Sequence, residues 1–306
     1  MSVKLFIDGA AGTTGLEIRE RLAGRRDVTL LALPEECRKA PQARADMLRA
    51  ADIVILCLPD EAAREAVALI GEAGTRVIDA STAHRTDRAW TYGFPELSPG
   101  QRDAVAGARM VSNPGCYPTG FLALVAPLVR AGLLPASAPL GVNAVSGYSG
   151  GGKAMIADYE AAGARAPAFS TYALTLAHKH LPEMRLHAGL DAAPLFAPAV
   201  VPTHRGMLVE VPLHAGIAAG LTADQVRDCW ADAYRGSAVV RLATAEGTLA
   251  VERCAGTDRL ELFVFTNGAD LRLVAALDNL GKGAGGAAVQ NMNLMAGFDE
   301  AAGLIL

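Results

Sequence analysis

The chain places Asp8-Gly9-Ala10-Ala11-Gly12-Thr13-Thr14-Gly15 between its first apolar run, Val3 to Ile7, and a segment with helical spacing, Gly15 to Leu22. A glycine-rich turn that joins a strand to a helix lets backbone N–H groups point at a phosphate, at the positive end of the helix dipole. The glycine spacing is GxxGxxG and not the GxGxxG of the dinucleotide fingerprint, so the position after the first strand is the stronger signal. The turn predicts a dinucleotide pyrophosphate site made by Gly9, Gly12, Thr13, Thr14 and Gly15.

The first third of the chain continues with a βαβ rhythm. Its apolar runs are short, continuous and rich in β-branched residues, which is typical of strands buried on both faces of a parallel sheet. We therefore expect an α/β fold whose first domain is a Rossmann-type, doubly wound parallel sheet. The further predicted strands are Val28 to Leu33, Ile53 to Leu58 and Thr75 to Asp79, and the predicted helices are Pro41 to Ala51 and Glu61 to Gly71.

The pattern changes after Cys116. Longer strands in mixed order predict a second, α+β domain with a mainly antiparallel sheet, and residues 266–270 predict a hairpin turn within it. The tail from Gly283 has helical spacing and could return to cover the first domain. We expect residues 1–112 with 284–306 to form the nucleotide-binding domain, and residues 113–283 to form the catalytic and oligomerisation domain. The predicted strands are Leu140 to Ser146, Leu195 to Val201, Met207 to Pro212, Val239 to Leu242, Leu260 to Thr266 and Leu271 to Asp278.

Composition excludes several classes of protein. The 306 residues are 51% hydrophobic and 20% charged, which is typical of a globular protein with a large core. A formal net charge of -4 and the lack of a basic block argue against nucleic acid as the main partner. No apolar run reaches the ~18 residues of a membrane helix and the N-terminus has no signal-peptide pattern, so we expect a cytoplasmic protein without membrane contact. The five scattered cysteines form no CxxC pair and predict neither a disulfide framework nor a zinc knuckle.

Cys116 is the predicted nucleophile. It lies in Ser112-Asn113-Pro114-Gly115-Cys116-Tyr117-Pro118-Thr119-Gly120, a Pro-Gly turn that runs into the apolar segment Phe121 to Val129. Unpaired backbone N–H groups and the helix dipole at such a position favour the thiolate. The alternative is a cysteine buried at a domain junction, but the flanking prolines and glycine indicate a shaped turn. Together with a dinucleotide site, this position predicts a nicotinamide enzyme that works through a thioester.

A general acid or base for the sulfur chemistry is expected in Ala177-His178-Lys179-His180-Leu181-Pro182-Glu183. We assign proton transfer to His180 and the orientation of its ring to Glu183. Zinc binding by two histidines at i and i+2 is the rival interpretation, but no further ligand pattern supports it, and we expect no metal. Three further histidines, His84, His187 and His214, have no supporting motif and are interpreted as surface or packing residues.

The remaining candidates bind anions or the cofactor. Val145-Ser146-Gly147-Tyr148-Ser149-Gly150-Gly151-Gly152-Lys153 can cradle an anion, although a flexible hairpin is its alternative. Arg85 and Arg205 stand in turn-rich contexts that suit carboxylate or phosphate binding, or else ordinary surface ion pairs. Asn279 could hydrogen-bond a nicotinamide carboxamide, or could be a turn residue. Arg38 with Lys39 could face a 2′-phosphate and favour NADP, although Glu35, Glu36 and a solvated loop leave NAD open. The predicted substrate-binding residues are Asn113, Ser146, Gly147, Ser149, Lys153, Arg85 and Arg205.

The chain resembles the shorter form of the N-acetyl-gamma-glutamyl-phosphate reductases from end to end. The resemblance rests on the glycine turn at 9–15, the cysteine motif at 112–119, His178-Lys179-His180-Leu181-Pro182-Glu183, and Lys282 to Asn293. The cysteine motif is the most specific of these. Related semialdehyde dehydrogenases share the architecture and the cysteine but have different histidine segments.

This resemblance implies the NADPH-dependent reduction of N-acetyl-glutamyl 5-phosphate in arginine biosynthesis, with a thioester on Cys116 and proton transfer by His180. It also implies a glyceraldehyde-3-phosphate dehydrogenase-like fold and a homodimer or homotetramer formed through the second domain's sheet. Two alternatives remain at this stage. One is a reductase of another acyl phosphate, aspartyl or aminoadipyl, and the other is a non-enzymatic regulator that senses NADP.

Overall fold

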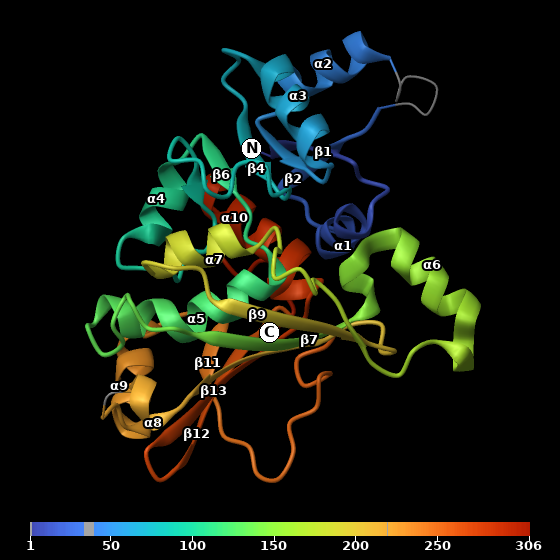
Figure 1. Cartoon of the computed structure of the whole chain (residues 1–306). Coiled ribbons are helices and arrows are strands. Elements are labelled where there is room, and N and C mark those ends of the chain that lie inside the picture. The colour runs from blue at the N-terminus through green and yellow to red at the C-terminus, as the bar shows by residue number, and fades with distance from the viewer. Residues whose placement is uncertain (1, 34–39, 219) are drawn as a thin grey trace. The chain divides into compact units, whose positions relative to one another are not determined.

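The computed structural model describes residues 2–33, 40–218 and 220–306. These residues form two compact units (Figure 1). The first consists of Met1–Pro95, Arg102–Pro114 and Ala284–Leu304, and the second of Glu96–Gln101, Gly115–Gly283 and Ile305–Leu306. The chain therefore crosses from the first unit into the second between Pro114 and Gly115, one residue before Cys116.

The first unit is built on a six-stranded parallel sheet of order β2-β1-β3-β4-β6-β5. Strands β2 and β3 end two residues before their predicted ends, at Leu31 and Leu56. The apolar residues that follow β2 line a pocket at the carboxyl edge of the sheet and make no ladder there. The strands are β1 (Val3–Asp8), β2 (Val28–Leu31), β3 (Ile53–Leu56), β4 (Arg76–Asp79), β5 (Thr91–Tyr92) and β6 (Met110–Ser112).

Helices bury both faces of this sheet, as the continuous apolar runs predict. One core packs strand residues such as Leu5 against α1, α4 and α10, which contribute Ile18, Val105 and Met292. The other core packs the opposite strand face against α2 and α3, for example at Leu48. The tail helix α10 thus packs in the same core as α1, within the first unit (Figure 1). The helices are α1 (Thr13–Arg21), α2 (Pro41–Ala50), α3 (Asp60–Ile70), α4 (Gln101–Gly107) and α10 (Gly286–Ala296).

The second unit is built on a seven-stranded mixed sheet of order β11-β12-β13-β10-β7-β9-β8. Four neighbouring pairs are antiparallel, whereas β7 with β9 and β11 with β12 are parallel. The predicted hairpin joins β12 to β13, with Asn267 opposite Asp270. The strands are β7 (Gly141–Gly147), β8 (Ser170–Thr171), β9 (Leu195–Val201), β10 (Met207–Leu213), β11 (Val240–Leu242), β12 (Leu260–Asn267) and β13 (Asp270–Leu277).

Helix α5 (Cys116–Arg130) lies on one face of this sheet (Figure 1). Its Gly120 has no room for a side chain, because an added Cβ would lie 2.8 Å from Cγ2 of Val209 on β10. Trp230 and Tyr234 donate hydrogen bonds to carbonyl groups of α5 and fix its outer side. The close approach at Gly120 holds the first turn of α5 against the sheet. The other helices of the unit are α6 (Gly152–Ala162), α7 (Leu181–Ala188), α8 (Ala215–Ala218) and α9 (Ala223–Ala233).

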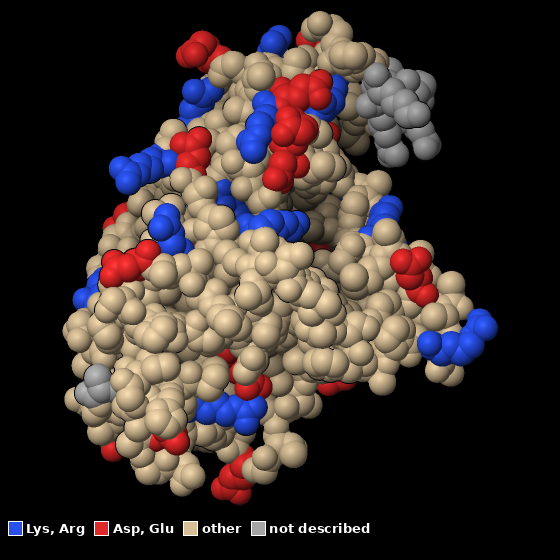
Figure 2. Space-filling view, in the orientation of Figure 1, with Lys and Arg blue, Asp and Glu red and all other residues tan. Residues whose placement is uncertain are grey.

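The surface carries no dominant charge on the face that Figure 2 shows, where Lys and Arg side chains are interspersed with Asp and Glu. Within residues 2–33, 40–218 and 220–306, no helix combines the length and the apolar character that crossing a membrane requires.

Candidate active site

Cys116 is the first residue of α5, as the sequence predicts for the nucleophile. The N-cap residue Gly115 has an extended backbone and offers no side-chain cap to the helix. Pro118 fits in the first turn because the N–H that it lacks would have no partner within the helix there. Cys116 is partly exposed. The thiol therefore lies at the positive end of the helix dipole, in the kind of environment that activates cysteine.

Gly283 lies against Cys116 within the second unit. A Cβ added at Gly283 would be 2.8 Å from the Cβ of Cys116 and 2.9 Å from the carbonyl oxygen of Asp278. The backbone N–H of Gly283 donates to that same Asp278 oxygen at 2.9 Å, and this hydrogen bond fixes the turn after β13. The residue beside the thiol is thus a glycine because no side chain fits.

Glu183 on α7 is buried, with 1% of its surface exposed. Its Oε1 accepts a hydrogen bond of 2.8 Å from the backbone N–H of Gly115. Sequence reasoning placed Glu183 in the site but assigned it to the His180 ring, and that role stays a prediction. The bond to Gly115 is a contact that the sequence did not indicate, because the partner is a backbone group 68 residues away.

A cluster of rings surrounds the residue after the nucleophile. Tyr117 contacts His178, His180 and Phe196 at centroid distances of 6.3, 6.1 and 5.1 Å, and the two histidine rings are 4.8 Å apart. The hydroxyl of Tyr172 donates to that of Tyr117 at 3.1 Å. The structure therefore brings the predicted base His180, which is 6% exposed, into the same cluster as the residue next to Cys116.

The pKa values of the cluster reflect its low polarity. Desolvation, with the positive charge of Lys179 as a smaller cause, lowers the pKa of His178, and the carboxylate of Glu183 opposes the shift. Desolvation raises the pKa of Tyr172 to about 12. The hydrogen bond with Tyr117 opposes this rise, and the negative charge of Cys116 adds to it. His178 Nδ1 accepts the backbone N–H of His180 at 3.2 Å, which leaves the proton of a neutral ring on Nε2. In its neutral form, His178 therefore offers the Nε2–H group as a donor.

The predicted anion loop lies against a second loop that contains Arg205. The N–H groups of Gly147, Tyr148 and Ser149 donate to the carbonyl groups of Gly206, Thr203 and His204 at 2.9, 2.9 and 3.1 Å. A Cβ at Gly147 would lie 2.8 Å from Arg205 backbone atoms, so only glycine allows this approach. The structure therefore brings together three predicted substrate residues of the first loop, Ser146, Gly147 and Ser149, with Arg205.

Asn279 connects the two loops. Its Oδ1 accepts from the N–H of Gly206 at 2.9 Å, and its Nδ2 donates to Oγ of Ser149 at 2.9 Å. Arg205 forms an ion pair with the buried carboxylate of Asp278 at 2.7 Å. Burial raises the pKa of Asp278, against the effects of backbone N–H donors and of Arg205. Asn279, predicted to touch the cofactor, holds loop geometry through these two bonds, and its contact with a cofactor stays a prediction.

The other predicted substrate residues belong to other elements. Lys153 is exposed in the first turn of α6. Arg85 and Asn113 belong to the first unit, where Arg85 Nε donates to the carbonyl oxygen of Asn113 at 2.9 Å. Asn113 Nδ2 donates to the Ala284 carbonyl at 3.1 Å. Arg85 is buried, with 7% of its surface exposed, and two of its hydrogen bonds go to the backbone carbonyl groups of Asn113 and Ala80; its substrate-binding role stays a prediction.

The glycine turn has the geometry of a phosphate cradle. Gly9 has a φ of 86°, and an added Cβ would meet the carbonyl oxygen of Cys57. A Cβ at Gly15 would lie 2.6 Å from the Gly9 oxygen, and the N-cap Gly12 offers no side-chain cap to α1. The N–H groups of the first turn of α1 thus remain available to a phosphate, and the backbone can approach it closely.

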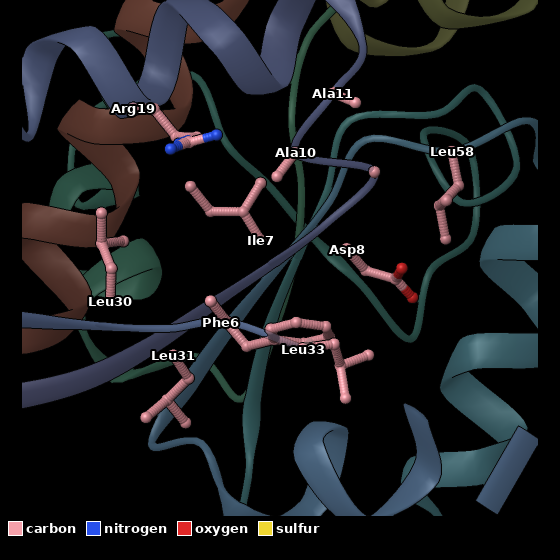
Figure 3. A pocket seen from close by; sticks show the side chains of 12 residues that line it. Phe6, Ile7, Asp8, Ala10, Ala11, Arg19, Leu30, Leu31, Leu33 and Leu58 are labelled. Carbon is pink, nitrogen blue, oxygen red and sulfur yellow. The ribbon is translucent and has the colours of Figure 1, made fainter. Parts of the chain in front are cut away.

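A pocket of about 370 Å³ adjoins this turn within the first unit (Figure 3). Gly9, Ala10 and Ala11 of the turn line it together with residues 30–33 at the end of β2. This is the place where the adenosine half of a dinucleotide binds in doubly wound folds, and the open, partly apolar lining fits it. The predicted 2′-phosphate residue Arg38 lies outside the described residues, with Lys39, Glu35 and Glu36.

Sequence reasoning missed one buried pair in the first unit. His84 is 9% exposed, its Nδ1 lies 2.7 Å from Oδ2 of the fully buried Asp79, and its ring stacks on Trp90 at 4.1 Å. The signal was the position of Asp79 at the carboxyl end of β4, five residues before the histidine. In the described part of the chain, no group of three or more His, Cys, Asp or Glu residues could hold a metal ion.

Two family models match the chain, one to each part of the fold. Residues 4–105 match the NAD binding domain of semialdehyde dehydrogenase, and residues 116–279 match its dimerisation domain. Aspartate semialdehyde dehydrogenase II from Vibrio cholerae has a similar structure, with a TM-score of 0.76 at 20% identity over 96% of this chain and 98% of that one. An aspartate semialdehyde dehydrogenase from Francisella tularensis has a TM-score of 0.69 at 15% identity, over 95% and 99% of the two chains. At this identity the structures show the fold alone.

The fold and a cysteine at the start of α5 define the class of semialdehyde dehydrogenases. Curated relatives named N-acetyl-gamma-glutamyl-phosphate reductase are much closer in sequence. That of Brucella anthropi is 52% identical over 97% of this chain and 99% of its own, and that of Trichormus variabilis 48% over 98% and 99%. The chain therefore belongs to the N-acetyl-gamma-glutamyl-phosphate reductase family. This confirms the predicted family, fold class and enzyme class, and the use of NADP.

Proposed function

We propose that the chain reduces N-acetyl-glutamyl 5-phosphate to N-acetyl-glutamate 5-semialdehyde and phosphate with NADPH, as a step of arginine biosynthesis, through a thioester on Cys116. The observation that best supports a thioester is the position of Cys116. It is a partly exposed cysteine and the first residue of a helix whose N-cap supplies no side-chain acceptor. The first-turn N–H groups and the dipole of α5 favour the thiolate and can also stabilise an oxyanion.

In the first half of the reaction the Cys116 thiolate attacks the acyl carbon of the acyl phosphate. The S–C bond forms, the bond from the acyl carbon to the phosphate oxygen breaks, and inorganic phosphate leaves with the electron pair. The α5 N–H groups stabilise the negative charge that develops on the carbonyl oxygen. Gly115, which precedes the nucleophile, is held in place by Glu183.

In the second half the thioester is reduced at Cys116. The bound NADPH supplies the hydride for this reduction. His180 donates a proton to the oxygen of the tetrahedral thiohemiacetal and takes it back when the C–S bond breaks. The products are the aldehyde and the Cys116 thiolate, which is ready for another turnover.

Substrate recognition belongs in this proposal to the two loops joined by Asn279. Ser146, Gly147 and Ser149 form one side and Arg205 the other. The N–H groups of Gly147 and Ser149 already donate to the facing loop, so the guanidinium of Arg205 is the donor that best suits an anion. The carboxylate of Asp278 fixes the orientation of Arg205 and reduces its net charge. Asn113, Arg85 and Lys153 are further substrate-binding candidates by residue chemistry.

The cofactor in this proposal binds to the first unit. Its pyrophosphate would lie against the glycine turn, at Gly9, Gly12, Thr13, Thr14 and Gly15, where the Gly12 N–H donates to the Gly9 carbonyl and the N–H groups of the first turn of α1 face outward. The steric fit at Gly9 and Gly15 supports this assignment. Asn279 and Arg38 complete the predicted cofactor set.

We also propose that the enzyme is a cytoplasmic homo-oligomer. The second unit leaves apolar surface uncovered: Leu195 on β9 is 59% exposed, and α6 has no buried residue. In Figure 1, α6 projects away from the seven-stranded sheet of its unit. Surface of this kind suits association with a second copy.

The test is the reverse reaction of the purified protein. NADP reduction is followed with N-acetyl-glutamate 5-semialdehyde, with and without phosphate, and with aspartate semialdehyde as the control substrate. We expect turnover of the acetylated substrate that depends on phosphate. Turnover of aspartate semialdehyde would support the same reaction on a different substrate, in a different pathway. No turnover of either substrate would contradict the proposed enzymatic function.

A matched variant tests the nucleophile. Cys116→Ser is expected to abolish turnover while NADP still binds, and Cys229→Ser, a partly exposed cysteine on α9, is expected to retain full activity. Full activity of Cys116→Ser would contradict the thioester. No turnover by the wild type, with NADP binding unchanged in Cys116→Ser, would favour a regulator that only senses NADP.

A further inference from the structure

The pocket beside the glycine turn contains a guanidinium that the sequence motifs did not single out. Arg19, on the second turn of α1, lines it together with the turn and the end of β2. Figure 3 shows the Arg19 side chain leaving its helix on the side where Ile7, Ala10 and Leu30 lie. A cation therefore lies on the wall where the adenosine ribose of a dinucleotide is expected.

Arg19 differs from Arg21 and Arg25 in having no recorded ion pair within the described residues. Arg21 is paired with Glu17 at 2.7 Å, and Arg25 with Asp27 at 2.5 Å. For Arg19, which is exposed, the described part of the structure records no ion pair or hydrogen bond. Its guanidinium can therefore meet a ligand without breaking an existing contact.

The single acidic residue among the described lining residues does not compete for this cation. Asp8 lies at the end of β1 and accepts a hydrogen bond from Arg44 Nε at 2.8 Å, and its side chain is 12% exposed. The charge of Asp8 is thus compensated from α2. The described lining is left with one positive charge of its own, at Arg19.

The described residues at the end of β2 offer no acceptor for a ribose hydroxyl. NAD-binding folds place a carboxylate there, which accepts from the 2′-hydroxyl of the ribose. In this chain the described residues at that position are Leu30, Leu31, Ala32 and Leu33, which offer no side-chain acceptor. The described wall therefore favours an anionic 2′-substituent over a free hydroxyl.

We propose that Arg19 binds the 2′-phosphate of the adenosine ribose and sets the preference of this enzyme for NADP over NAD, an inference that rests on the use of NADP. The planar guanidinium suits a phosphate dianion, with which it forms paired, charge-assisted hydrogen bonds. The same role was predicted for Arg38, which lies on the other side of β2 in the sequence.

The test measures binding without catalysis. Calorimetric titration compares 2′,5′-ADP, which carries the 2′-phosphate, with 5′-AMP, which lacks it, on the full chain. We expect Arg19→Ala to raise the Kd for 2′,5′-ADP by roughly 10- to 100-fold and to change the Kd for 5′-AMP less than about twofold, as for the loss of charge-assisted hydrogen bonds. Arg19→Lys, which keeps the charge, should recover part of the loss.

Arg26→Ala is the matched control, since Arg26 is an exposed arginine of the same unit that does not line the pocket. It should bind both nucleotides as the wild type does. The proposal is overturned if Arg19→Ala keeps its affinity for 2′,5′-ADP, if it loses affinity for both nucleotides equally, or if Arg38→Ala alone removes the discrimination. Reductase activity at saturating NADPH would persist in each of those cases, so they differ from a failure of the proposed function.

Discussion

The carboxylate of Glu183 and the backbone nitrogen of Gly115 are 2.8 Å apart, and the hydrogen bond between them joins α7 to the residue that precedes the nucleophile. Gly115 is the N-cap of α5 and has no side chain with which to bond its own helix. A buried carboxylate from another element therefore sets the backbone position from which Cys116 begins the helix. The histidine segment and the cysteine motif are thus connected through backbone as well as through ring contacts.

Glu183→Ala removes this acceptor and leaves the Gly115 N–H buried without it. We expect kcat to fall by about 10- to 100-fold, as for a lost charge-assisted hydrogen bond, and the alkylation of Cys116 by iodoacetamide to slow. Glu183→Gln keeps an oxygen acceptor and should recover much of both rates. Equal thiol alkylation rates in Glu183→Ala and the wild type would contradict this positioning role.

Gly283→Ala places a methyl group against the nucleophile. Its Cβ would lie 2.8 Å from the Cβ of Cys116, so the thiol or the turn after β13 must move. A displacement of this size at a reacting group costs up to about 100-fold in rate, which we expect to see in kcat. Gly141→Ala is the control, because no atom lies within 4 Å of the Cβ added there. If the two variants have the same kcat, the contact at Gly283 does not position the thiol.

Local patterns predicted much of this fold. The run Leu195 to Val201 is a strand with the predicted bounds, and the βαβ rhythm is found as six parallel strands between two helix layers. These features depend on burial of both sheet faces, which the sequence records directly as continuous apolar runs. The position of Cys116 at a helix start was equally readable, because a Pro-Gly turn precedes it.

Contacts between residues far apart in the chain could not be predicted from the sequence. Gly115 and Glu183, which are 68 residues apart, lie in segments that the sequence singled out, but neither segment indicates that the carboxylate accepts from this backbone N–H. Arg19 was hidden in a different way, since a charged residue on a surface helix is ordinarily solvated. Only the pocket that β2 and the glycine turn form around it gives the residue a candidate role.

Lys282 and Glu96 form another such pair, 186 residues apart. Their side chains are 1% and 7% exposed, and Nζ lies 2.9 Å from Oε2. Lys282→Met leaves a buried carboxylate without this partner, so we expect the free energy of unfolding in urea to fall by about 3–5 kcal/mol. The double variant with Glu96→Gln should recover part of the loss, and exposed Lys153→Met should change little. A double variant less stable than Lys282→Met would contradict the pairing.

His178 should make stability depend on pH in a predictable direction. Desolvation holds its pKa in the folded protein below the ordinary value of about 6.5. Well above pH 6.5 the ring is neutral in both states and contributes no slope. As the pH falls below 6.5, the unfolded chain takes up a proton that the folded protein refuses, so the free energy of unfolding decreases until the lower, folded pKa is passed. His178→Gln should therefore flatten the stability profile as the pH falls through and below about 6.5 in urea titrations. His214→Gln, at a histidine whose side chain is 79% exposed, provides the control and should keep the wild-type slope. An unchanged slope in His178→Gln would show that the ring titrates in the folded protein as it does in the unfolded chain.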